Sequence, residues 1–402
     1  MALVPQRELI TPQTLLERAE GLADELAAES AARDAQRLLP VDAFARIRAL
    51  RLGLLRLPRE WGGAGGGVTD MARLAIALAR GDSNVAQAFL GHFVVLERVR
   101  LMGTPGQHAR YLALAGQGVL FGAAAAERGS GVRGELKTRL RRAGAHWVLD
   151  GIKHYSTGAW FADVLKIRAL DEDGQLVAAL VPADRAGVER IDDWDGMGQR
   201  CTASGTTVLR AVRIEPQEVL SMQPWKGRRH HTGALAQIFH CAIEVGIGLA
   251  VLRDAVDWGR RGIRPVPESG VARAQDDPYV LHTIGDIAAQ VHAARALVLE
   301  AAGRIDQAAQ ARFDGAGDIE ALAVQASVAT AQAKIVATQA ALRAAQLLFD
   351  VGGAATTLRA HNYDRHWRNA RTHTVHDPVA YKFKAVGNYF LNGEAPPLTF
   401  SY

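Results

Sequence analysis

The chain has 402 residues, 49% of them hydrophobic and 22% charged, which is the composition of a globular protein large enough for two or three domains. The formal net charge is +5, but the basic residues are dispersed and not interleaved with aromatic residues, so we expect no nucleic-acid partner. Only two cysteines occur, and the first residues lack a signal-peptide pattern, which predicts a reduced, cytoplasmic protein. No apolar run is long enough to predict a membrane span.

Residues 1–118 are predicted to form an N-terminal helical domain. Thr11 and Pro12 are a typical helix start, a capping residue followed by proline in the first turn. The next residues repeat apolar side chains every three to four positions, as an amphipathic helix does. The glycine-rich segment LPREWGGAGGG (57–67) is predicted to be a loop, and it lacks the Lys-Ser/Thr pair of a phosphate-binding loop.

Residues 119–220 are predicted to form a middle β domain. The segment HWVLDGIKHYS (146–156) places Asp150 and Gly151 between two strand-like runs, which predicts a tight hairpin at this dipeptide. The segment VLKIRALDEDGQLVAALVP (164–182) predicts a second hairpin with a longer turn. The β-branched run SGTTVLRAVRIEP (204–216) predicts a further strand.

Residues 221–402 are predicted to form a C-terminal helical bundle with an active-site tail. Helical periodicity begins at Gly233 and continues through three long segments, two of them rich in alanine. Gly352 and Gly353 end the third where a helix C-cap is expected. The tail contains RHWRNARTHTVHDPVAYK (365–382), which crowds histidines, arginines and a tryptophan together. The predicted fold class is therefore α+β and mostly α.

This order of a helical domain, a β domain and a four-helix bundle resembles the acyl-CoA dehydrogenase superfamily. The motifs AAERGSG (125–131) and YSTGAWFADVLKI (155–167) are similar to its flavin-contacting segments. GMGQRCTASGTTVL (196–209) resembles its Gly-x-Arg-x-Thr-x-Ser-Gly strand, and LFDVGGAATT (348–357) resembles its Gly-Gly segment before the last helices. Four longer stretches resemble one branch, the flavin monooxygenases of the dibenzothiophene and sulfur-acquisition type. These stretches are IDDWDGMGQR (191–200), RPVPESGVARAQDDPY (264–279), RHWRNARTHTVHDPVAYK (365–382) and NYFLNGEAPP (388–397).

The resemblance implies a two-component monooxygenase that takes reduced FMN from a separate flavin reductase. Such an enzyme oxygenates a small organosulfur compound, a sulfide, sulfone or thiophene, with O2 through a flavin C4a-hydroperoxide. The superfamily usually forms homotetramers with flavin sites at subunit interfaces. Two alternatives remain: an FAD-dependent acyl-CoA dehydrogenase or oxidase, and a flavin-binding homologue without catalysis. The dehydrogenases carry a glutamate base where this chain has the segment His376–Val379, so that base is absent, and Asp377 precedes a restricting proline.

The resemblance also implies which side chains act in catalysis. A histidine of the C-terminal segment is expected to exchange a proton near the flavin, since histidine titrates near neutrality. His376 is the first candidate and His373 the second, with Ser156 as a hydroxyl donor and His92 as a third partner. Each also has a structural interpretation, as a bundle, turn or core residue. No Cys or Glu stands at a recognised metal-ligand spacing from the two C-terminal histidines, so no metal is predicted.

For the cofactor, the resemblance implies that the backbone of residues 123–128 and 152–156 lines the flavin ring, and that an arginine of a neighbouring subunit holds the phosphate. Arg264 is the first candidate for that arginine, with Arg261 and Arg273 as alternatives. FMN is expected, and FAD is the alternative. The expected cofactor-binding residues are Ala123, Ala124, Ala125, Ala126, Glu127, Arg128, Tyr155, Ser156, Trp194, Arg264, Ala354 and Ala355.

Overall fold

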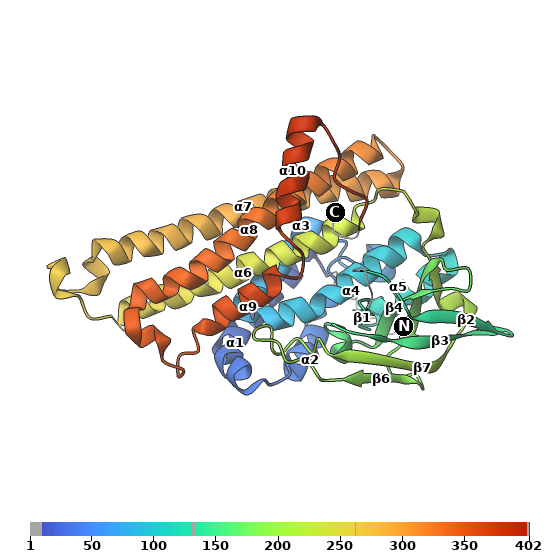
Figure 1. The fold of residues 1–402 in the computed structure, drawn as a ribbon, viewed down its shortest axis with the longest axis horizontal. Helices are drawn as coiled ribbons and strands as arrows, with labels where there is room; N and C mark the ends of the chain where they lie inside the picture. The colour runs from blue at the N-terminus through green and yellow to red at the C-terminus, as the bar shows by residue number, and fades with distance from the viewer. Residues whose placement is uncertain (1–9, 130–133, 262, 400–401) are drawn as a thin grey trace, which may run out of the picture.

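The computed structural model describes residues 10–129, 134–261, 263–399 and 402, and it begins with a group of helices (Figure 1). The first helix starts as the sequence predicts, because the Thr11 hydroxyl accepts a hydrogen bond from the Thr14 amide at 3.1 Å and Pro12 follows the cap. The helices of this group are α1 (Pro12–Gln36), α2 (Val41–Ala49), α3 (Val68–Gly81), α4 (Ser83–Met102) and α5 (Pro105–Gly116).

The strands follow and form one mixed sheet in the order β6-β7-β3-β2-β4-β5-β8, with β1 parallel to β4. The predicted hairpin between residues 164 and 182 is confirmed as the pair β4 and β5. The strands are β1 (Phe121–Ala124), β2 (Arg139–Ala143), β3 (His146–Lys153), β4 (Val164–Leu170), β5 (Leu176–Pro182), β6 (Val188–Ile191), β7 (Thr206–Ile214) and β8 (Val219–Ser221).

The predicted hairpin at Asp150 and Gly151 is wrong. Strand β3 runs through this dipeptide, and its register with β7 shifts between Leu149 and Gly151, as at a β-bulge. The Asp150 carboxylate accepts a hydrogen bond from the Ala211 amide at 2.7 Å, and a Cβ at position 151 would collide with the Thr138 side chain. The glycine is therefore required by a close approach of neighbouring chain segments, and the true turn lies between β2 and β3.

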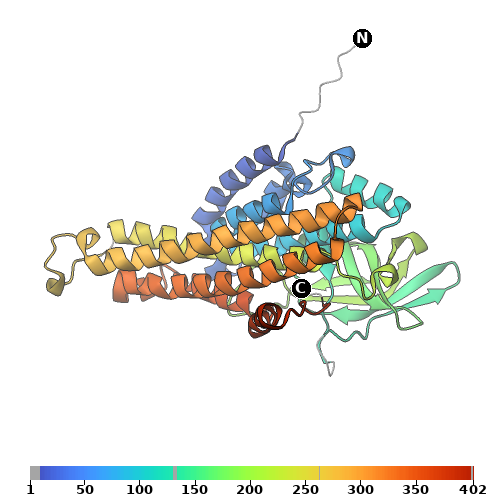
Figure 2. The same ribbon diagram turned by 90° about the horizontal axis from the view of Figure 1, so that it is seen from above.

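Three long helices extend away from the sheet and pack side by side (Figure 2). They are α6 (Thr232–Arg261), α7 (Pro278–Asp314) and α8 (Ile319–Gly352), and α9 (Asp364–Thr374) and α10 (Ala380–Asn392) pack against them. The predicted C-cap is confirmed, because α8 ends at Gly352 and Gly353 has φ +59°. The α+β, mostly α fold class is confirmed.

Helix α6 corrects one expectation from the sequence. It is long and apolar enough to cross a membrane by length and composition, although no such run was predicted. In the fold, 83% of its most apolar window is buried among the other helices. A core helix surrounded by partners needs no polar face, which explains its composition.

The two faces of β4 pack against different parts of the molecule. Leu165, Ile167 and Ala169 point into the core of the β domain. Val164 belongs to the large core that the helices build. Since side chains alternate along a strand, Lys166 and Arg168 share the helical side with Val164. This placement puts two cationic residues on the inner face of the sheet.

Candidate active site

Helix α9 carries most of the histidine-rich stretch, and buried ion pairs hold it in place. The Asp254 carboxylate on α6 accepts from Arg365 at 2.8 Å and lies 2.7 Å from the His366 ring. Burial alone would raise the pKa of Asp254, but these contacts lower it. On the other side, Arg368 pairs with Asp34 of α1 at 2.7 Å. These anchors orient Asn369, Ala370 and His373 of α9 toward the interior.

His373 lies at the centre of a buried polar network. Its Nδ1 is 3.1 Å from Glu244 Oε1, and its Nε2 is 3.0 Å from His240 Nδ1 and 3.2 Å from Gln87 Oε1. Glu244 also binds the Lys334 ammonium. Burial lowers the pKa of both His373 and His240, so both rings are neutral near pH 7. Burial would raise the pKa of Glu244, but the Lys334 charge lowers it.

Four members of this network were not predicted from the sequence. Gln87, His240, Glu244 and Lys334 come from α4, α6 and α8 and meet only in the folded chain. A weak signal existed, because His240 and Glu244 stand four apart on one face of an otherwise apolar helix. Polar residues on such a face require partners when they are buried.

His376 follows the end of α9 and lies at the edge of the network. Its ring centroid is 4.4 Å from that of His240, and 46% of its side chain is exposed. The neighbouring Asp377 is buried, and although burial alone would raise its pKa, the adjacent His376 ring and the Lys382 charge lower it. The two rings therefore connect the buried network to solvent. Asp377 is held as an anion by cationic partners, which does not suit a base beside a substrate.

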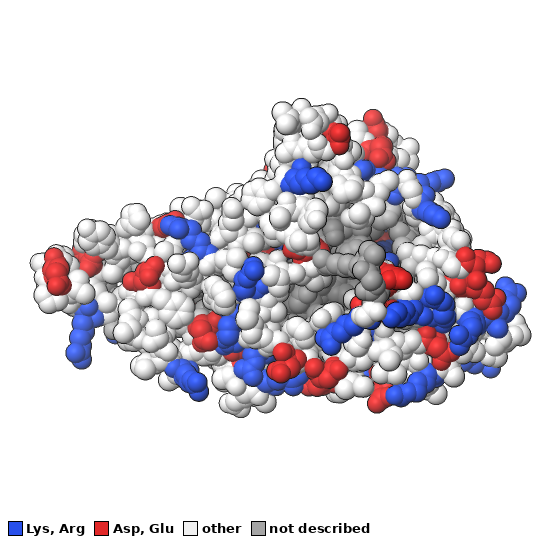
Figure 3. Space-filling view, viewed as in Figure 1, with Lys and Arg blue, Asp and Glu red and all other residues white. Residues whose placement is uncertain are grey.

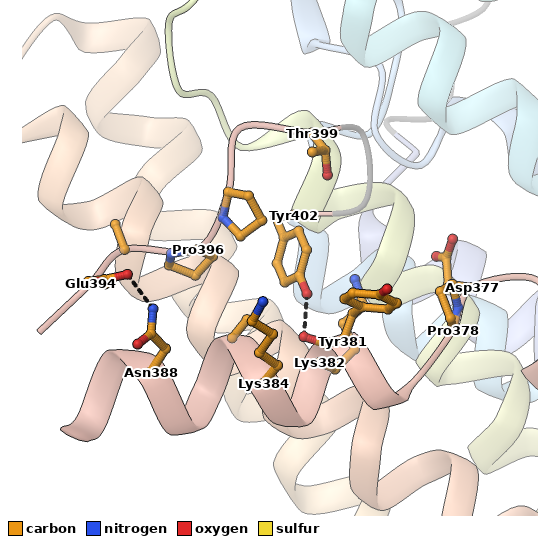
Figure 4. A pocket seen from close by; sticks show the side chains of 13 residues that line it. Asp377, Pro378, Tyr381, Lys382, Lys384, Asn388, Glu394, Pro396, Thr399 and Tyr402 are labelled. Atoms are coloured by element: carbon orange, nitrogen blue, oxygen red, sulfur yellow. Dashed lines mark hydrogen bonds between the residues drawn. The ribbon is translucent and has the colours of Figure 1, made fainter. Parts of the chain in front are cut away.

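A cavity of about 540 Å³ opens between α10 and the C-terminal segment (Figure 4). Asp377 borders it, and the Lys382 ammonium lies 3.9 Å from the centroid of the Tyr402 ring. The Tyr402 hydroxyl donates to the Tyr381 carbonyl at 2.7 Å. The end of the chain thus packs over α10 beside the histidine cluster.

Ser156 lies in a turn after β3 and is 2% exposed. Its amide donates to the Gly205 carbonyl at 3.0 Å, but its hydroxyl oxygen has no hydrogen-bond partner among the described residues. A buried hydroxyl without a partner costs free energy unless a ligand satisfies it. Tyr155 beside it has φ +55°, a strained backbone conformation of the kind that often marks functional sites.

The two segments expected to line a flavin ring lie next to each other. The His154 amide donates to the Ala126 carbonyl at 2.9 Å, which joins residues 123–128 to residues 152–156. The Lys153 ammonium is 2.5 Å from the Glu127 carboxylate. Burial would raise the pKa of Glu127, but the Lys153 hydrogen bond brings it to about 2. Glu127 therefore has a structural role in joining these segments.

The side chains around this turn fit a flat, partly polar ring. The Trp194 ring meets the Tyr155 ring edge-on at 6.1 Å, and the Arg128 guanidinium lies 4.6 Å from the Tyr155 centroid. Ala123 and Ala125 are partly exposed and their small side chains allow a close neighbour, whereas Ala124 is buried in the core of the β domain. With the unsatisfied Ser156 hydroxyl, these residues fit a flavin. The surface is hollowed between the helical bundle and the strands, and Lys and Arg side chains gather beside that hollow (Figure 3).

His92 does not reach this group. Its Nε2 donates to the Gly53 carbonyl at 2.8 Å, and its Nδ1 accepts from the Phe121 amide at 3.3 Å. Burial lowers its pKa to about 4, and its ring packs against Phe89 and Phe93. With both nitrogens engaged in the core, His92 has a structural role here, and we do not include it in the proposed catalytic group.

The expected phosphate-binding residues lie at the other end of the bundle. Arg264 follows α6, and Ala354 and Ala355 follow α8, so both segments lie at the bundle end farthest from the strands (Figure 1). The two alternative arginines are engaged locally, since Arg273 pairs with Asp276 at 2.9 Å and Arg261 with its helix neighbour Asp257. One chain therefore does not bring Arg264 and Ser156 together.

The comparisons with known proteins agree with this geometry. The N-terminal domain family of acyl-CoA dehydrogenases matches residues 13–118, and the C-terminal domain family matches residues 238–380. A dibenzothiophene monooxygenase from Mycolicibacterium goodii is 34% identical over 365 residues, covering 87% of each chain.

Two solved structures are similar over nearly the whole chain. The FMN-bound TdsC of Paenibacillus sp. A11-2 is 30% identical with a TM-score of 0.91, covering 96% of this chain and 100% of that one. The methanesulfinate monooxygenase MsuC of Pseudomonas fluorescens is 29% identical with a TM-score of 0.89, covering 96% and 99%. The chain belongs to the acyl-CoA dehydrogenase superfamily and, within it, to the family of the dibenzothiophene monooxygenases.

Proposed function

We propose that this protein is an FMN-dependent monooxygenase that oxygenates an organosulfur compound. One observation carries the proposal: His240, His373 and His376 form a cluster beside the segment in which, by resemblance, the dehydrogenases carry their carboxylate base. The buried carboxylates near them are engaged, Glu244 with Lys334 and Asp377 with His376. An acyl-CoA dehydrogenase needs a carboxylate that can accept a proton, so the histidine cluster favours oxygenation. Relatives that are FMN-bound or named monooxygenases support the same class.

The network gives each histidine a defined task. When the Nδ1–H of His373 donates to Glu244, its Nε2 accepts from the Nδ1–H of His240, and the Gln87 side-chain amide then turns its NH2 group toward the same nitrogen. This fixes the His240 tautomer and leaves its Nε2 without a proton on the other side of the ring. The His376 ring lies tilted 4.4 Å from the His240 ring and is partly exposed, so it can then exchange a proton with solvent and hold it at the site. Glu244 and Lys334 hold the three imidazole rings in position.

Ser156, Tyr155, Trp194 and the backbone of residues 123–128 would hold the ring of FMN. When bound in its reduced form, FMN supplies the two electrons with which O2 yields one transferable oxygen atom and water. The Ser156 hydroxyl would donate to the ring edge, since it has no partner among the described residues. Apolar surroundings on α4 and β1 exclude water, which strengthens such a hydrogen bond.

The direct test supplies FMN, a flavin reductase and isotopically labelled oxygen, ¹⁸O2, to the purified protein together with a panel of sulfides, sulfones, thiophenes and sulfinates. We expect one ¹⁸O atom in the product of at least one sulfur compound, detected by mass spectrometry. Acyl-CoA-dependent dye reduction without labelled product would instead identify a dehydrogenase. Reduced FMN that reoxidises at its rate in free solution, with no labelled product, would reject the proposal.

We further propose a cytosolic homotetramer in which a neighbouring subunit brings Arg264, or another arginine, to the FMN phosphate. The separation of Arg264 from Ser156 within one chain supports this arrangement. Large exposed apolar residues on α10 supply a surface for it, including Phe390 at 67% and Leu391 at 84% exposure. Both cysteines are buried and free, which suits a reducing compartment.

This assembly predicts the effect of a charge on α10. We expect Leu391→Asp to dissociate the tetramer and to weaken FMN binding, because a carboxylate would lose its hydration in an apolar interface. Light scattering coupled to gel filtration measures the mass. Asp173→Lys, a charge change at the exposed β4–β5 turn, is the control and should leave the mass unchanged. A tetramer that persists in Leu391→Asp would place the interface elsewhere.

A further inference from the structure

The segment between β6 and β7 carries one wall of the proposed flavin site. We call residues 192–205 the β6–β7 loop. It includes Trp194, whose indole Nε1 donates to the Gln199 carbonyl at 2.8 Å. The Thr202 hydroxyl donates to the same carbonyl at 2.9 Å. The Gln199 carbonyl therefore holds both the aromatic ring proposed to flank the flavin and the turn that follows it.

The same loop supports the turn that carries Ser156. The Ser156 amide donates to the Gly205 carbonyl at 3.0 Å. The Thr157 hydroxyl lies 2.7 Å from that of Ser204, which in turn lies 2.7 Å from the Thr202 hydroxyl. A displacement of the β6–β7 loop would therefore move both walls of the proposed flavin site together.

Asn369 of α9 holds this loop from the other side. Its Oδ1 accepts a hydrogen bond from the Gln199 amide at 2.6 Å, and Asn369 is 6% exposed. The Gln199 amide makes no other hydrogen bond within the described part of the chain. The helix and the loop are in direct contact, since a Cβ on Gly198 would lie 2.0 Å from the Arg368 carbonyl oxygen. Asn369 thus binds the loop where it lies closest to α9.

The loop depends on such contacts because its backbone is strained. Gln199 has φ +52° and Ala203 has φ +48°, in the left-handed region that residues other than glycine rarely adopt. These conformations persist only where the surrounding structure holds them. Asn84 of α4 provides a further contact, since its Oδ1 accepts from the Cys201 amide at 3.0 Å. Loss of an anchor is expected to let the loop relax and to shift the wall of the flavin site.

The two helices that hold Gln199 also hold the histidine network. Asn369 and His373 are four residues apart and lie buried on the same face of α9. Ser83 and Gln87 are four residues apart on α4. The Ser83 hydroxyl accepts from the Gln199 side-chain amide at 3.1 Å, and the Gln87 side-chain amide lies 3.2 Å from His373 Nε2. One helical turn on each of two helices therefore separates the loop from the histidine network.

We infer that Asn369 is a positioning residue for the oxygenation. Acting through the Gln199 amide, it keeps the β6–β7 loop, and with it both walls of the flavin site, at a fixed distance from the histidine network. The inference rests on the proposed monooxygenase function and adds to it a residue that acts through the loop and not on the flavin itself. Such placement matters because a displacement of about 1 Å can lower the rate of an enzymatic step by about 100-fold.

Asn369→Leu keeps a branched side chain and removes the acceptor. We expect the visible circular dichroism of bound FMN to change, because the surroundings of the ring change, and FMN to bind about tenfold more weakly. In turnover with the sulfur compound that the ¹⁸O2 test identifies, the product formed per reduced FMN consumed should fall by about tenfold. The rest of the oxygen should leave as hydrogen peroxide.

Asn369→Asp keeps an oxygen atom in the acceptor position and should restore the circular dichroism and bring the product yield to within about twofold of the wild type. Asn369→Ser, whose hydroxyl is too short to reach the Gln199 amide, should behave as the leucine variant does and replaces it if that variant folds poorly. Arg371→Leu, at an exposed position of the same helix, is the control and should match the wild type. Urea denaturation of each variant measures its stability separately.

Two results would overturn the inference. In the first, the leucine and serine variants lose stability but keep the wild-type circular dichroism and product yield, so that Asn369 only stabilises the fold. In the second, Asn369→Asp is as impaired as Asn369→Leu, which would assign the effect to altered packing on α9 and not to the hydrogen bond with Gln199. The circular dichroism does not depend on oxygen transfer, so it decides the inference by itself. Absence of labelled product from the wild type would reject the proposed function alone.

Discussion

Replacing His376 with alanine is expected to lower the yield of oxygenated product by about 100-fold, while reduced FMN continues to react with O2 and the oxygen leaves as hydrogen peroxide. The reason lies in its position. The His376 ring lies tilted 4.4 Å from the His240 ring and its side chain is 46% exposed, so His376 is the one of these three histidines that reaches solvent. His240 and His373 are both buried.

The measurement is the ratio of product to hydrogen peroxide per reduced FMN consumed. Val375→Ala, at the exposed neighbouring residue, is the control and should retain wild-type coupling. His376→Gln keeps a hydrogen-bonding group without the ability to titrate, so it should be nearly as uncoupled as the alanine variant. If His376→Gln instead remains coupled, His376 acts as a hydrogen-bond donor only. Wild-type coupling in both variants would remove His376 from the catalytic group.

Replacing Lys334 with methionine is expected to lower the free energy of unfolding by about 3 to 5 kcal/mol, because Glu244 would remain buried without a counter-ion. Lys334 is 1% exposed, and Glu244 is fully buried and also binds His373 and Thr338. Urea denaturation at one protein concentration measures the loss. The double variant Lys334→Met/Glu244→Gln removes both charges and should recover most of it.

The pH dependence of this loss has a definite sign. In the wild type the folded-state pKa of Glu244 is lowered by Lys334, so the stability it contributes is present above the unfolded pKa and decreases as the pH falls. In Lys334→Met, burial without the cation raises that pKa above its unfolded value. The loss in the free energy of unfolding caused by Lys334→Met is then large at neutral pH and smaller in acid. The difference in the free energy of unfolding between variant and wild type should therefore shrink from pH 7 to pH 4. A difference that stays constant would show that the buried Glu244 charge is not its cause.

Local sequence patterns were sufficient for the class of the fold and for many of its boundaries. Thr11 and Pro12 predict the start of α1, and Gly352 and Gly353 predict the end of α8, because capping depends on residues next to each other in the chain. The Asp150–Gly151 hairpin failed for the complementary reason. The sequence shows a glycine that permits a turn, but in the fold this glycine is needed because the Thr138 side chain, just before β2, leaves no room for a Cβ.

At the candidate site, too, the sequence identified the residue types of the C-terminal tail, whereas their contacts became visible only in the fold. The sequence alone identified the histidine-rich stretch 365–382 and the motifs of the acyl-CoA dehydrogenase superfamily. It did not reveal that His373 meets Glu244 and His240. Burial and charge pairing depend on residues brought together from distant elements, and no local pattern encodes them. The sequence by itself therefore determined the family and the reactive residue types, and only the tertiary structure decided which side chains share a site.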